Sequence, residues 1–374
     1  MSEIVIVGGG LAGAAAAARL AQGGARPLLL ERSTGAHDKI CGEFLSTEAQ
    51  AHLRAIGFDL ARLGGAPIDR LRLIAGSRRI ATRLPFRAVG VTRRVLDEAL
   101  LEHAVAAGAK VERGITVREI GGTPGSNRVP ATISTTSGDI TAKRLLLATG
   151  KHDVRGAKRD TAGTIDDLIG FKQYFRVSAA TRADLFGHIE VVLFDGGYAG
   201  LQLVEGGVAN LCLLVSRDRY AAAGDWPTLF ADLLREPHLH ACLGDATPLL
   251  DRPLTIAGVP YGFVHRGDDG AFRLGDQAGV IPSFSGDGMS IALHSAAVAA
   301  RGVLEDGDAA AYHRRLRADI AGQIARATWL QRLGWSRAGR AVLLAGLTLA
   351  PSSMARAATW TRVSGPALVR AGVA

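Results

Sequence analysis

The pattern of apolar and polar positions at the start of the chain predicts a strand, a tight turn and a helix. Four apolar residues that favour strands, Ile4–Val7, lead into the glycine-rich segment 8–13, and an alanine-rich helical stretch follows over residues 14–20. A second apolar run occupies residues 27–30. A strand–helix–strand order of this length is typical of a parallel sheet with helices on its faces.

The three glycines of segment 8–13 have separate physical roles in such a turn. Gly8 lets the strand turn sharply, Gly10 lets a pyrophosphate approach the backbone, and Gly13 lets the helix pack close to the strand. The helix N-terminus adds free N–H groups and a partial positive charge. Glu31, after the second strand, is the acid expected to bind the ribose hydroxyls of an adenosine. The segment predicts a dinucleotide site; the alternative is a glycine-rich turn in an ordinary α/β protein.

Further along, the patterns predict alternating strands and helices, then a β-rich stretch, and finally helices. Thr47 and Gln50 form a capping-box pattern for a helix that ends near Ile56, and Thr92 caps an amphipathic helix over residues 93–107. Other helices are expected at residues 226–234, 288–304, 308–333 and 337–349. Strands are expected at residues 71–75, 80–84, 115–120, 131–141, 144–149, 259–265 and 271–274, with a polar loop at 121–127.

Between residues 171 and 215 the chain contains four β-like runs separated by turn-forming segments. The runs cover residues 171–177, 188–194, 198–204 and 208–215. We expect them to form an antiparallel meander with one packed face and one solvated face.

Composition narrows the class of protein. The chain has 374 residues, of which 48% are hydrophobic and 21% charged, and this describes a soluble globular protein. Its three cysteines, Cys41, Cys212 and Cys242, lie far apart, which argues against a disulfide framework or a metal site and suits the cytoplasm. We see no signal-peptide pattern, and no apolar run reaches the ~20 residues that a membrane span needs.

The positive charge is concentrated in the last part of the chain. Residues 311–374 contain ten arginines and a single acid, Asp319, and so account for the whole net charge of +9. These arginines form either a solvated helical face or a docking surface for an anionic carrier protein, a coenzyme A phosphate or lipid headgroups. No nucleic-acid partner is expected. The apolar residues 341–350 either make peripheral contact with a membrane or, in the interpretation we favour, pack over the substrate cavity.

A second glycine-bearing segment lies about 260 residues after the first. The predicted strand 271–274 ends at Gly275 and Asp276, and Gly286, Gly288 and Met289 lead into a helix. An acid at a strand end can hydrogen-bond a polyol chain, and a helix N-terminus under an electron-poor ring stabilises negative charge on that ring.

In their order and separation, these segments resemble the flavoprotein family of aromatic hydroxylases and geranylgeranyl reductases over about the first 300 residues. The resemblance implies that one FAD spans both glycine-bearing segments. It places Arg93, in the segment 91–97, beside the FAD phosphates, and the segment 147–150 at the family's middle motif. The cofactor-binding residues that it implies are Gly8, Gly10, Gly13, Glu31, Arg32, Cys41, Gly42, Arg93, Val117, Gly150, Asp276, Gly286, Gly288 and Met289.

The fold implied by the resemblance is α/β, with a discontinuous Rossmann-like FAD-binding domain, an antiparallel β-sheet substrate domain and C-terminal helices. The expected ranges are residues 1–170 and 266–306 for the FAD-binding domain, 171–265 for the substrate domain and 307–374 for the helical segment, with 66–90 able to join the substrate domain.

In this family the β-rich stretch forms a roof over the substrate, so its side chains are candidates for the substrate site. The polar candidates are Asp195, Tyr198 and Gln202. The apolar residues Leu193, Phe194, Leu201 and Leu203 predict an apolar cavity with few polar anchors.

Several details separate the subgroups of the family. Lys39-x-Cys41-Gly42 resembles the K/R-x-C-G segment of geranylgeranyl reductases, in which the cysteine faces the flavin. Thr149-Gly150 stands where the hydroxylases carry Asp-Gly, so their reductant-binding scheme does not transfer directly. No W-x-W-x-I-P motif is present, which argues against a halogenase. A second strand–G-x-G-x-x-G–helix unit is also lacking, and the resemblance implies NAD(P)H as a reductant that visits the flavin transiently.

Three functions remain open at this point. An NAD(P)H-linked monooxygenase that hydroxylates an apolar aromatic or polyketide-like metabolite is slightly favoured, with the substrate free or tethered to a carrier. The alternatives are a reductase of isolated C=C bonds in a prenyl chain and a flavin-bound electron-transfer protein, which predicts no deep cavity. Cys41 is the candidate proton donor beside the flavin, and Tyr261 is the candidate catalytic residue on the substrate side; either can instead be a packing residue.

Overall fold

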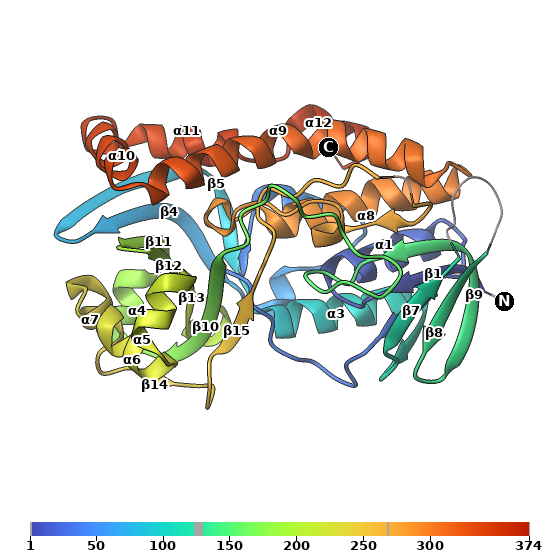
Figure 1. Ribbon diagram of the computed structural model, residues 1–374, viewed down its shortest axis with the longest axis horizontal. Coiled ribbons are helices and arrows are strands. Elements are labelled where there is room, and N and C mark those ends of the chain that lie inside the picture. The colour runs from blue at the N-terminus through green and yellow to red at the C-terminus, as the bar shows by residue number, and fades with distance from the viewer. Residues whose placement is uncertain (1, 123–129, 268, 374) are drawn as a thin grey trace.

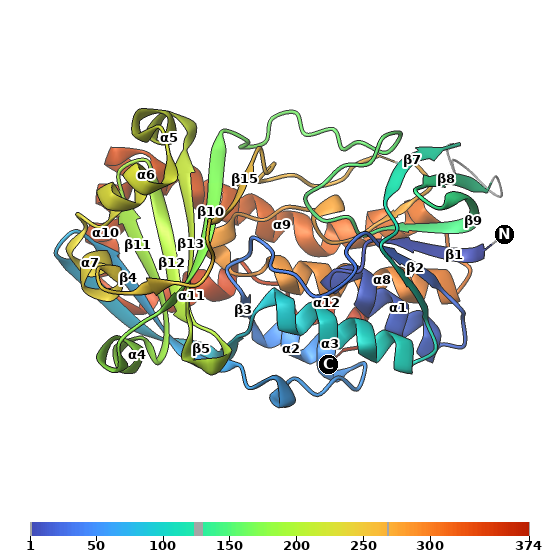
Figure 2. The same cartoon turned by 90° about the horizontal axis from the view of Figure 1, so that it is seen from below.

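The computed structural model describes residues 2–122, 130–267 and 269–373. Within this part of the chain two sheets lie at opposite ends of the molecule, and a layer of C-terminal helices runs along both (Figures 1 and 2). Most of the polar loop predicted at 121–127 lies outside the described residues.

The first sheet has seven strands around a parallel core. The order is β6-β2-β1-β9-β8-β7, with β16 also pairing with β9. The strands are β1 (Ser2–Val7), β2 (Leu28–Glu31), β6 (Lys110–Arg113), β7 (Val117–Gly121), β8 (Ala131–Thr135), β9 (Gly138–Leu147) and β16 (Phe272–Arg273). Because β16 pairs in parallel with β9, which pairs in parallel with β1, the second glycine-bearing segment is brought to the strand ends next to the first.

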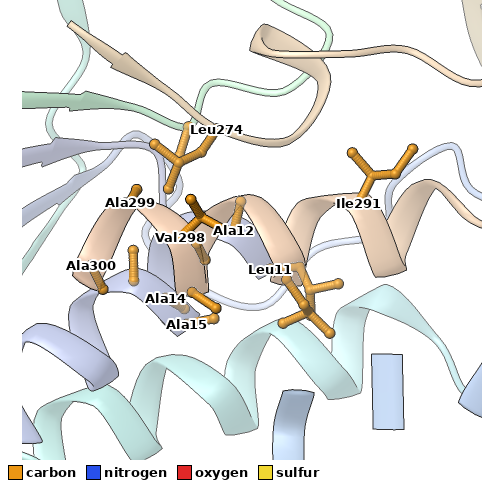
Figure 3. Packing of buried hydrophobic residues seen from close by; sticks show 14 of the residues in the cluster. Leu11, Ala12, Ala14, Ala15, Leu274, Ile291, Val298, Ala299 and Ala300 are labelled. Carbon is orange, nitrogen blue, oxygen red and sulfur yellow. The ribbon is translucent and has the colours of Figure 1, made fainter. Parts of the chain in front are cut away.

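Helices α1 (Leu11–Gln22), α3 (Arg93–Ala106) and α8 (Gly288–Leu304) cover one face of this sheet, and α2 (Thr47–Arg54) packs against α8. Helix α1 is buried along nearly its whole length, since its alanines let α8 approach closely. Figure 3 shows Ala12, Ala14 and Ala15 of α1 and Val298, Ala299 and Ala300 of α8 in one buried cluster. The predicted α/β fold is therefore confirmed for this region.

The second sheet has nine strands, in the order β14-β10-β13-β12-β11-β4-β5-β3, with β15 also pairing with β10. The strands are β3 (Phe44–Leu45), β4 (Ala66–Ala75), β5 (Arg78–Gly90), β10 (Leu168–Arg176), β11 (Gly187–Phe194), β12 (Gly197–Leu203), β13 (Ala209–Ser216), β14 (Thr247–Pro248) and β15 (Leu254–Ala257). The hairpin β4–β5 joins this sheet through the parallel pairing of β4 with β11. The domain boundaries stay a prediction.

Helices cover one face of the second sheet and leave the other face toward the rest of the molecule. Four short helices make the cover: α4 (Ala179–Leu185), α5 (Arg217–Ala223), α6 (Trp226–Leu233) and α7 (Pro237–Leu243). Phe175 of β10, Leu201 of β12 and Leu211 of β13 pack against Leu229 and Leu233 of α6.

The C-terminal layer consists of α9 (Ala309–Trp335), α10 (Arg337–Leu349), α11 (Ser352–Trp360) and α12 (Gly365–Arg370). Figure 1 shows α9 extending along the molecule and α10 and α11 lying over β4 and β5. No single helix in the described ranges is long and apolar enough to span a membrane; α10 and the segment 352–370 pass that test only as a pair bent by 119°.

Several local predictions are wrong, for identifiable reasons. Ser46, not Thr47, caps α2, because the Ser46 hydroxyl accepts the N–H of Ala49. The predicted strand 131–141 is divided by a turn into β8 and the start of β9. Residues 259–265 form only isolated bridges.

The order of the second sheet also differs from a simple meander, since β10 pairs with β13 and not with β11. The interposed helix α4 carries the chain from β10 to β11, and a seven-residue helix is too short to give a clear periodic signal. Helices α5 and α7 are equally short and were likewise not predicted.

Candidate active site

One cavity of about 610 Å³ joins the two sheets. Its walls include the glycine-rich turn after β1, the segment 275–289 and the inner face of the second sheet. Of the residues predicted for the cofactor and for catalysis, Gly13 alone does not line it. Two glycine-bearing segments about 260 residues apart in sequence therefore meet in one cavity, as predicted.

The glycine-rich turn has the geometry that the sequence predicts. Gly8 has a φ of +105°, and a Cβ there would collide with the backbone of Ala148. A Cβ on Gly13 would lie less than 3.0 Å from the carbonyl oxygen of Gly8, which explains why Gly13 supports the turn without reaching the cavity. Helix α1 begins after Gly10 with no side-chain cap, so its first N–H groups remain available to an anion.

Glu31 lies beside this turn and is held in its ionised form. Its Oε2 accepts the N–H of Gly9 at 2.6 Å and its Oε1 accepts that of Ser33 at 2.8 Å. Burial acts to raise the pKa of the carboxyl, but the backbone hydrogen bonds keep it below the ordinary value. Arg32 is exposed at the edge of the cavity, and Val117 lies on its wall.

Two cations lie beside Gly10 and share a single carboxylate. Arg93 binds Asp97 through two hydrogen bonds of 2.7 and 2.8 Å, and Lys39 Nζ lies 2.7 Å from the same carboxylate. A Cβ on Gly10 would be 3.4 Å from Lys39 Nζ and 3.5 Å from the Arg93 guanidinium. The group therefore has a net positive charge where phosphates are expected. Lys39 was not predicted as a member of this group, because it is 29 residues from Gly10 in sequence.

The other end of the cofactor groove lies at the N-terminus of α8. Helix α8 also begins without a side-chain cap, and no atom lies within 4 Å of a Cβ placed on Gly288. Gly286 has a φ of +66° and packs against Phe44. Asp276 lines the cavity between the two ends, close to Gly150, whose carbonyl accepts from Gln277 at 2.8 Å.

The groove thus contains two helix N-termini without a side-chain cap. That of α1 lies beside Lys39 and Arg93, and that of α8 leaves free space beside Gly288. This suits a long ligand with a pyrophosphate in its middle and an electron-poor ring at one end, and it fits the donor groups that FAD needs. The fold and site define an FAD-binding flavoprotein.

Comparison with known proteins gives the family. Residues 2–203 match the profile described as pyridine nucleotide-disulphide oxidoreductase. The chain belongs to that family and is an FAD-dependent oxidoreductase.

The relatives carry out different chemistries. The chain is 24% identical over 358 residues to a flavin-dependent halogenase of Armillaria mellea, covering 83% of this chain and 70% of the halogenase. It is 26% identical over 342 residues to the menaquinone reductase of Mycobacterium tuberculosis, covering 86% and 81%. The structure of the halogenase PltM in complex with phloroglucinol and FAD has a TM-score of 0.73 at 15% identity, covering 99% of this chain and 90% of that one. These names do not single out the aromatic hydroxylases or the geranylgeranyl reductases.

Cys41 and Gly42 lie where the cofactor groove meets the second sheet. Both line the cavity; Cys41 is half-buried, and the Gly42 carbonyl accepts from Asn210 at 2.9 Å. The next residue, Glu43, has a φ of +60°, which is unusual for a residue with a side chain. The loop is therefore held in a strained conformation at the junction.

A fully buried cluster around Glu43, which the sequence did not reveal, holds this loop. Glu43 Oε1 lies 2.5 Å from Lys172 Nζ and accepts from the Tyr174 hydroxyl at 2.7 Å and from the Arg93 N–H at 2.8 Å. Lys172 Nζ also donates to the carbonyl of Lys39 at 3.1 Å. Burial raises the pKa of Glu43, against the opposing effect of the Lys172 ammonium. Lys172 and Tyr174 gave no separate signal, because the strand also carries Gln173 and Arg176 and nothing in its sequence shows which polar side chains face inward.

The substrate end of the cavity is apolar. Its wall is formed by side chains of the second sheet and the segment 280–284: Ile189, Val191, Leu214, Leu254, Ile256, Val280, Ile281 and Phe284. Tyr198 and Tyr261 also line it, and the Tyr261 hydroxyl accepts from Ser283 at 2.9 Å. Burial raises the pKa of both tyrosines, so they remain protonated.

Other residues proposed for the roof lie elsewhere. Asp195 is exposed and pairs with Arg340 of α10, because it sits in the turn after β11. Phe194, Leu201 and Leu203 belong to the cluster on the helix-covered face of the sheet. The side of a strand on which a residue lies depends on register, which the sequence did not fix. Gln202 is buried and donates to the Glu43 carbonyl at 2.9 Å.

The C-terminal helices complete the wall. Ala358 and Arg362 line the cavity, and the Arg362 guanidinium lies 4.1 Å from the ring centroid of Phe86. Arg362 also pairs with the buried Asp287 at 3.3 Å. Part of the arginine-rich segment therefore packs over the cavity.

Proposed function

We propose that this oxidoreductase is a reductase of a carbon–carbon double bond in an apolar, prenyl-bearing substrate of the menaquinone kind. The observation that carries the proposal is the position of Cys41 and Gly42 at the junction between the cofactor groove and the apolar cavity. The similarity to menaquinone reductases over most of both chains supports it. The sequence pattern alone placed oxygenation slightly ahead; the position of this loop reverses that order.

Reduced FAD, when bound, supplies the electron pair and one hydrogen that the reduction of a double bond requires. The protein has to hold the double bond against the ring, exclude water and provide the second hydrogen as a proton. The Cys41 thiol is the donor we assign, because the other ionisable groups of this loop that line the cavity, Lys39 and Glu43, are already held in ion pairs with Asp97 and Lys172. The Lys172–Glu43 cluster keeps the loop in place, and Tyr261 with Ser283 is the polar anchor in the apolar wall. NAD(P)H remains the reductant that we expect.

The second candidate is the monooxygenase predicted from the sequence. It is favoured by the similarity of the fold to halogenases, whose names describe flavin-dependent halogenation. Halogenation itself is less favoured, since the chain lacks the W-x-W-x-I-P motif. A pure electron-transfer protein is disfavoured by the cavity of about 610 Å³, because such a protein needs no deep substrate site.

Product analysis tests the proposal directly. The FAD-loaded protein is reduced without oxygen, mixed with a short-chain menaquinone, and the flavin absorbance and product mass are followed. After any quinol in the product has been reoxidised to the quinone in air, a product that still carries two extra hydrogens has a reduced carbon–carbon double bond and supports the reductase. A product that returns to the starting mass was reduced only at the quinone carbonyls and counts against the proposal. A product that forms only in air and gains an oxygen atom supports the monooxygenase and overturns the proposal.

Cys41→Ser tests whether the junction loop donates a proton through Cys41 or only packs beside the cofactor. We expect the rate at which the double bond of the menaquinone is reduced to fall by roughly a hundredfold or more, as for loss of a general acid, with the flavin spectrum unchanged. Cys242→Ser, in α7 outside the cavity, is the matched control and should keep the wild-type rate. Equal rates in all three proteins would remove Cys41 from the mechanism.

A further inference from the structure

The outward face of α10 carries apolar side chains that contact no other part of the described chain closely enough to be buried. Val342 is 69% exposed and Leu349 is 88% exposed. Ala338, Ala341 and Ala345 are exposed as well, and spacings of three, four and seven residues place all five on one side of the helix. Apolar faces of this kind on a protein surface mark binding sites.

The opposite face of α10 already has its packing partners. Leu344 packs with Ile80 of β5 and Met354 of α11, and Arg340 donates to the carbonyl of Phe194 at 2.8 Å. Helix α10 is therefore fixed to the substrate sheet, and its outward face is not simply a misplaced core face.

Two tryptophans are exposed on neighbouring helices of the same layer. Trp329 of α9 is 56% exposed and Trp360 of α11 is 50% exposed. Arg326 connects the two helices, because its Nε donates to the Trp360 carbonyl at 2.8 Å and its guanidinium lies 5.4 Å from the centroid of that ring. Tryptophan and arginine side chains are both suited to the boundary between water and lipid.

Charge decides which partner suits this layer. Residues 311–374 carry ten arginines. Four of them form ion pairs: Arg337 and Arg340 with Asp195, Arg362 with Glu48 and Asp287, and Arg370 with Asp319. Within the described residues the other six have no ion-pair partner, and the one acidic side chain of this segment, Asp319, is 1% exposed and also pairs with His294. A second copy of the chain would bring two arginine-rich surfaces together, which repel. An anionic surface with an apolar layer beneath it satisfies both the arginines and the apolar face.

We infer that the outward face of α10, together with Trp329 and Trp360, docks on the surface of a membrane that contains anionic lipids. Helix α10 has 13 residues, about 20 Å, which is shorter than a bilayer core of about 30 Å, so it lies in the interface and does not cross it. The bend of 119° between α10 and the segment 352–370 suits two helices lying along a surface.

Docking in this orientation would bring the cavity close to the lipid. The helix α11 and the residues after it contribute Ala358 and Arg362 to the cavity wall. This step rests on the proposed function: a prenyl-bearing substrate dissolved in the bilayer would reach the flavin from the docked side.

Vesicle co-sedimentation of the FAD-loaded protein tests the docking without any turnover. We expect binding to phosphatidylglycerol vesicles at low salt, little binding to phosphatidylcholine vesicles, and release by added salt. The double variant Val342→Glu with Leu349→Glu should lower the bound fraction by about tenfold. The matched control is Val105→Glu with Phe186→Glu, which changes two similarly exposed apolar side chains outside the C-terminal layer.

Each alternative result has a defined meaning. Equal binding by both double variants, or equal binding to both kinds of vesicle, overturns the docking face. Self-association of the wild-type protein in sedimentation velocity that Val342→Glu with Leu349→Glu abolishes would assign the face to a second copy instead. A protein that reduces menaquinone yet ignores vesicles would overturn the docking and leave the proposed function standing.

Discussion

The two ends of the cavity are built from different parts of the chain. The cofactor end is formed mainly by backbone groups. Its glycines let a ligand approach the backbone closely, and the uncapped N-termini of α1 and α8 present their N–H groups to it. At the substrate end, side chains of the second sheet and the C-terminal helices form the wall. The cofactor end tolerates few substitutions, because its glycines leave no room for side chains. The substrate end can change its chemistry through single side-chain changes, which is consistent with relatives of different activity on one fold.

The largest expected effect breaks the cofactor end. In Gly13→Ala the new Cβ would collide with the carbonyl oxygen of Gly8, which is backbone and cannot move aside. We expect a loss of stability of at least about 5 kcal/mol, at the upper end for a single substitution, together with loss of bound FAD. Thermal unfolding and the flavin absorbance of the purified protein measure both.

Gly35→Ala is the matched control, because a Cβ there meets nothing within 4 Å and the residue does not have a positive φ. It should behave as the wild type. If Gly13→Ala keeps its FAD and its melting temperature, the turn has room for a Cβ at residue 13, and the collision with the Gly8 carbonyl oxygen is not a constraint on it.

This contrast also explains how much of the molecule could be predicted. The cofactor end follows local rules, because a strand, three glycines at fixed spacing and a helix form the same turn in many proteins, and Gly8 and Gly10 line the cavity together with Gly286 of the second glycine-bearing segment. The substrate end depends on which face each strand turns inward, and that is decided by pairing between distant segments. Asp195 and Leu201 were therefore assigned to a cavity that they do not reach, while Lys172 escaped notice.

The next effect concerns the junction between the two ends. Lys172→Met leaves the Glu43 carboxylate buried without its cation, and we expect a loss of about 3 to 5 kcal/mol in the free energy of unfolding. The double variant Lys172→Met with Glu43→Gln removes both charges and should recover part of that loss. Urea unfolding of the four proteins of this cycle gives the coupling energy between the two residues.

A coupling energy near zero would mean that the pair does not fix the loop, and the strained φ of Glu43 would then need another support. If the coupling energy is large, and the flavin spectrum changes in Lys172→Met but not in the double variant, the cluster positions the Cys41–Gly42 loop against the cofactor.

The smallest of the three effects concerns Asp287, where the cofactor end of the cavity contacts the C-terminal segment that forms part of the substrate end. Asp287 belongs by sequence to the glycine-bearing turn, yet its carboxylate serves the C-terminal segment, since Oδ2 accepts the Val363 N–H at 3.2 Å and Oδ1 lies 3.3 Å from Arg362. Burial raises the pKa of Asp287 from 3.8 to about 7, against the opposing charge of Arg362. Nearby Glu48, 3.4 Å from Arg362, raises it further.

Between these two pKa values the folded protein holds a proton that the unfolded chain has released. Its stability therefore decreases as the pH rises from about 4 to about 7, by on the order of 3 kcal/mol from this group, and is level above that range. Asp287→Asn keeps an acceptor for Val363 without the titration. The stability of the wild type minus that of Asp287→Asn should accordingly fall between pH 5 and pH 8 in urea unfolding. If the difference stays constant or grows with pH, Arg362 keeps Asp287 ionised throughout, and the C-terminal segment is joined to the cofactor turn by a permanent ion pair.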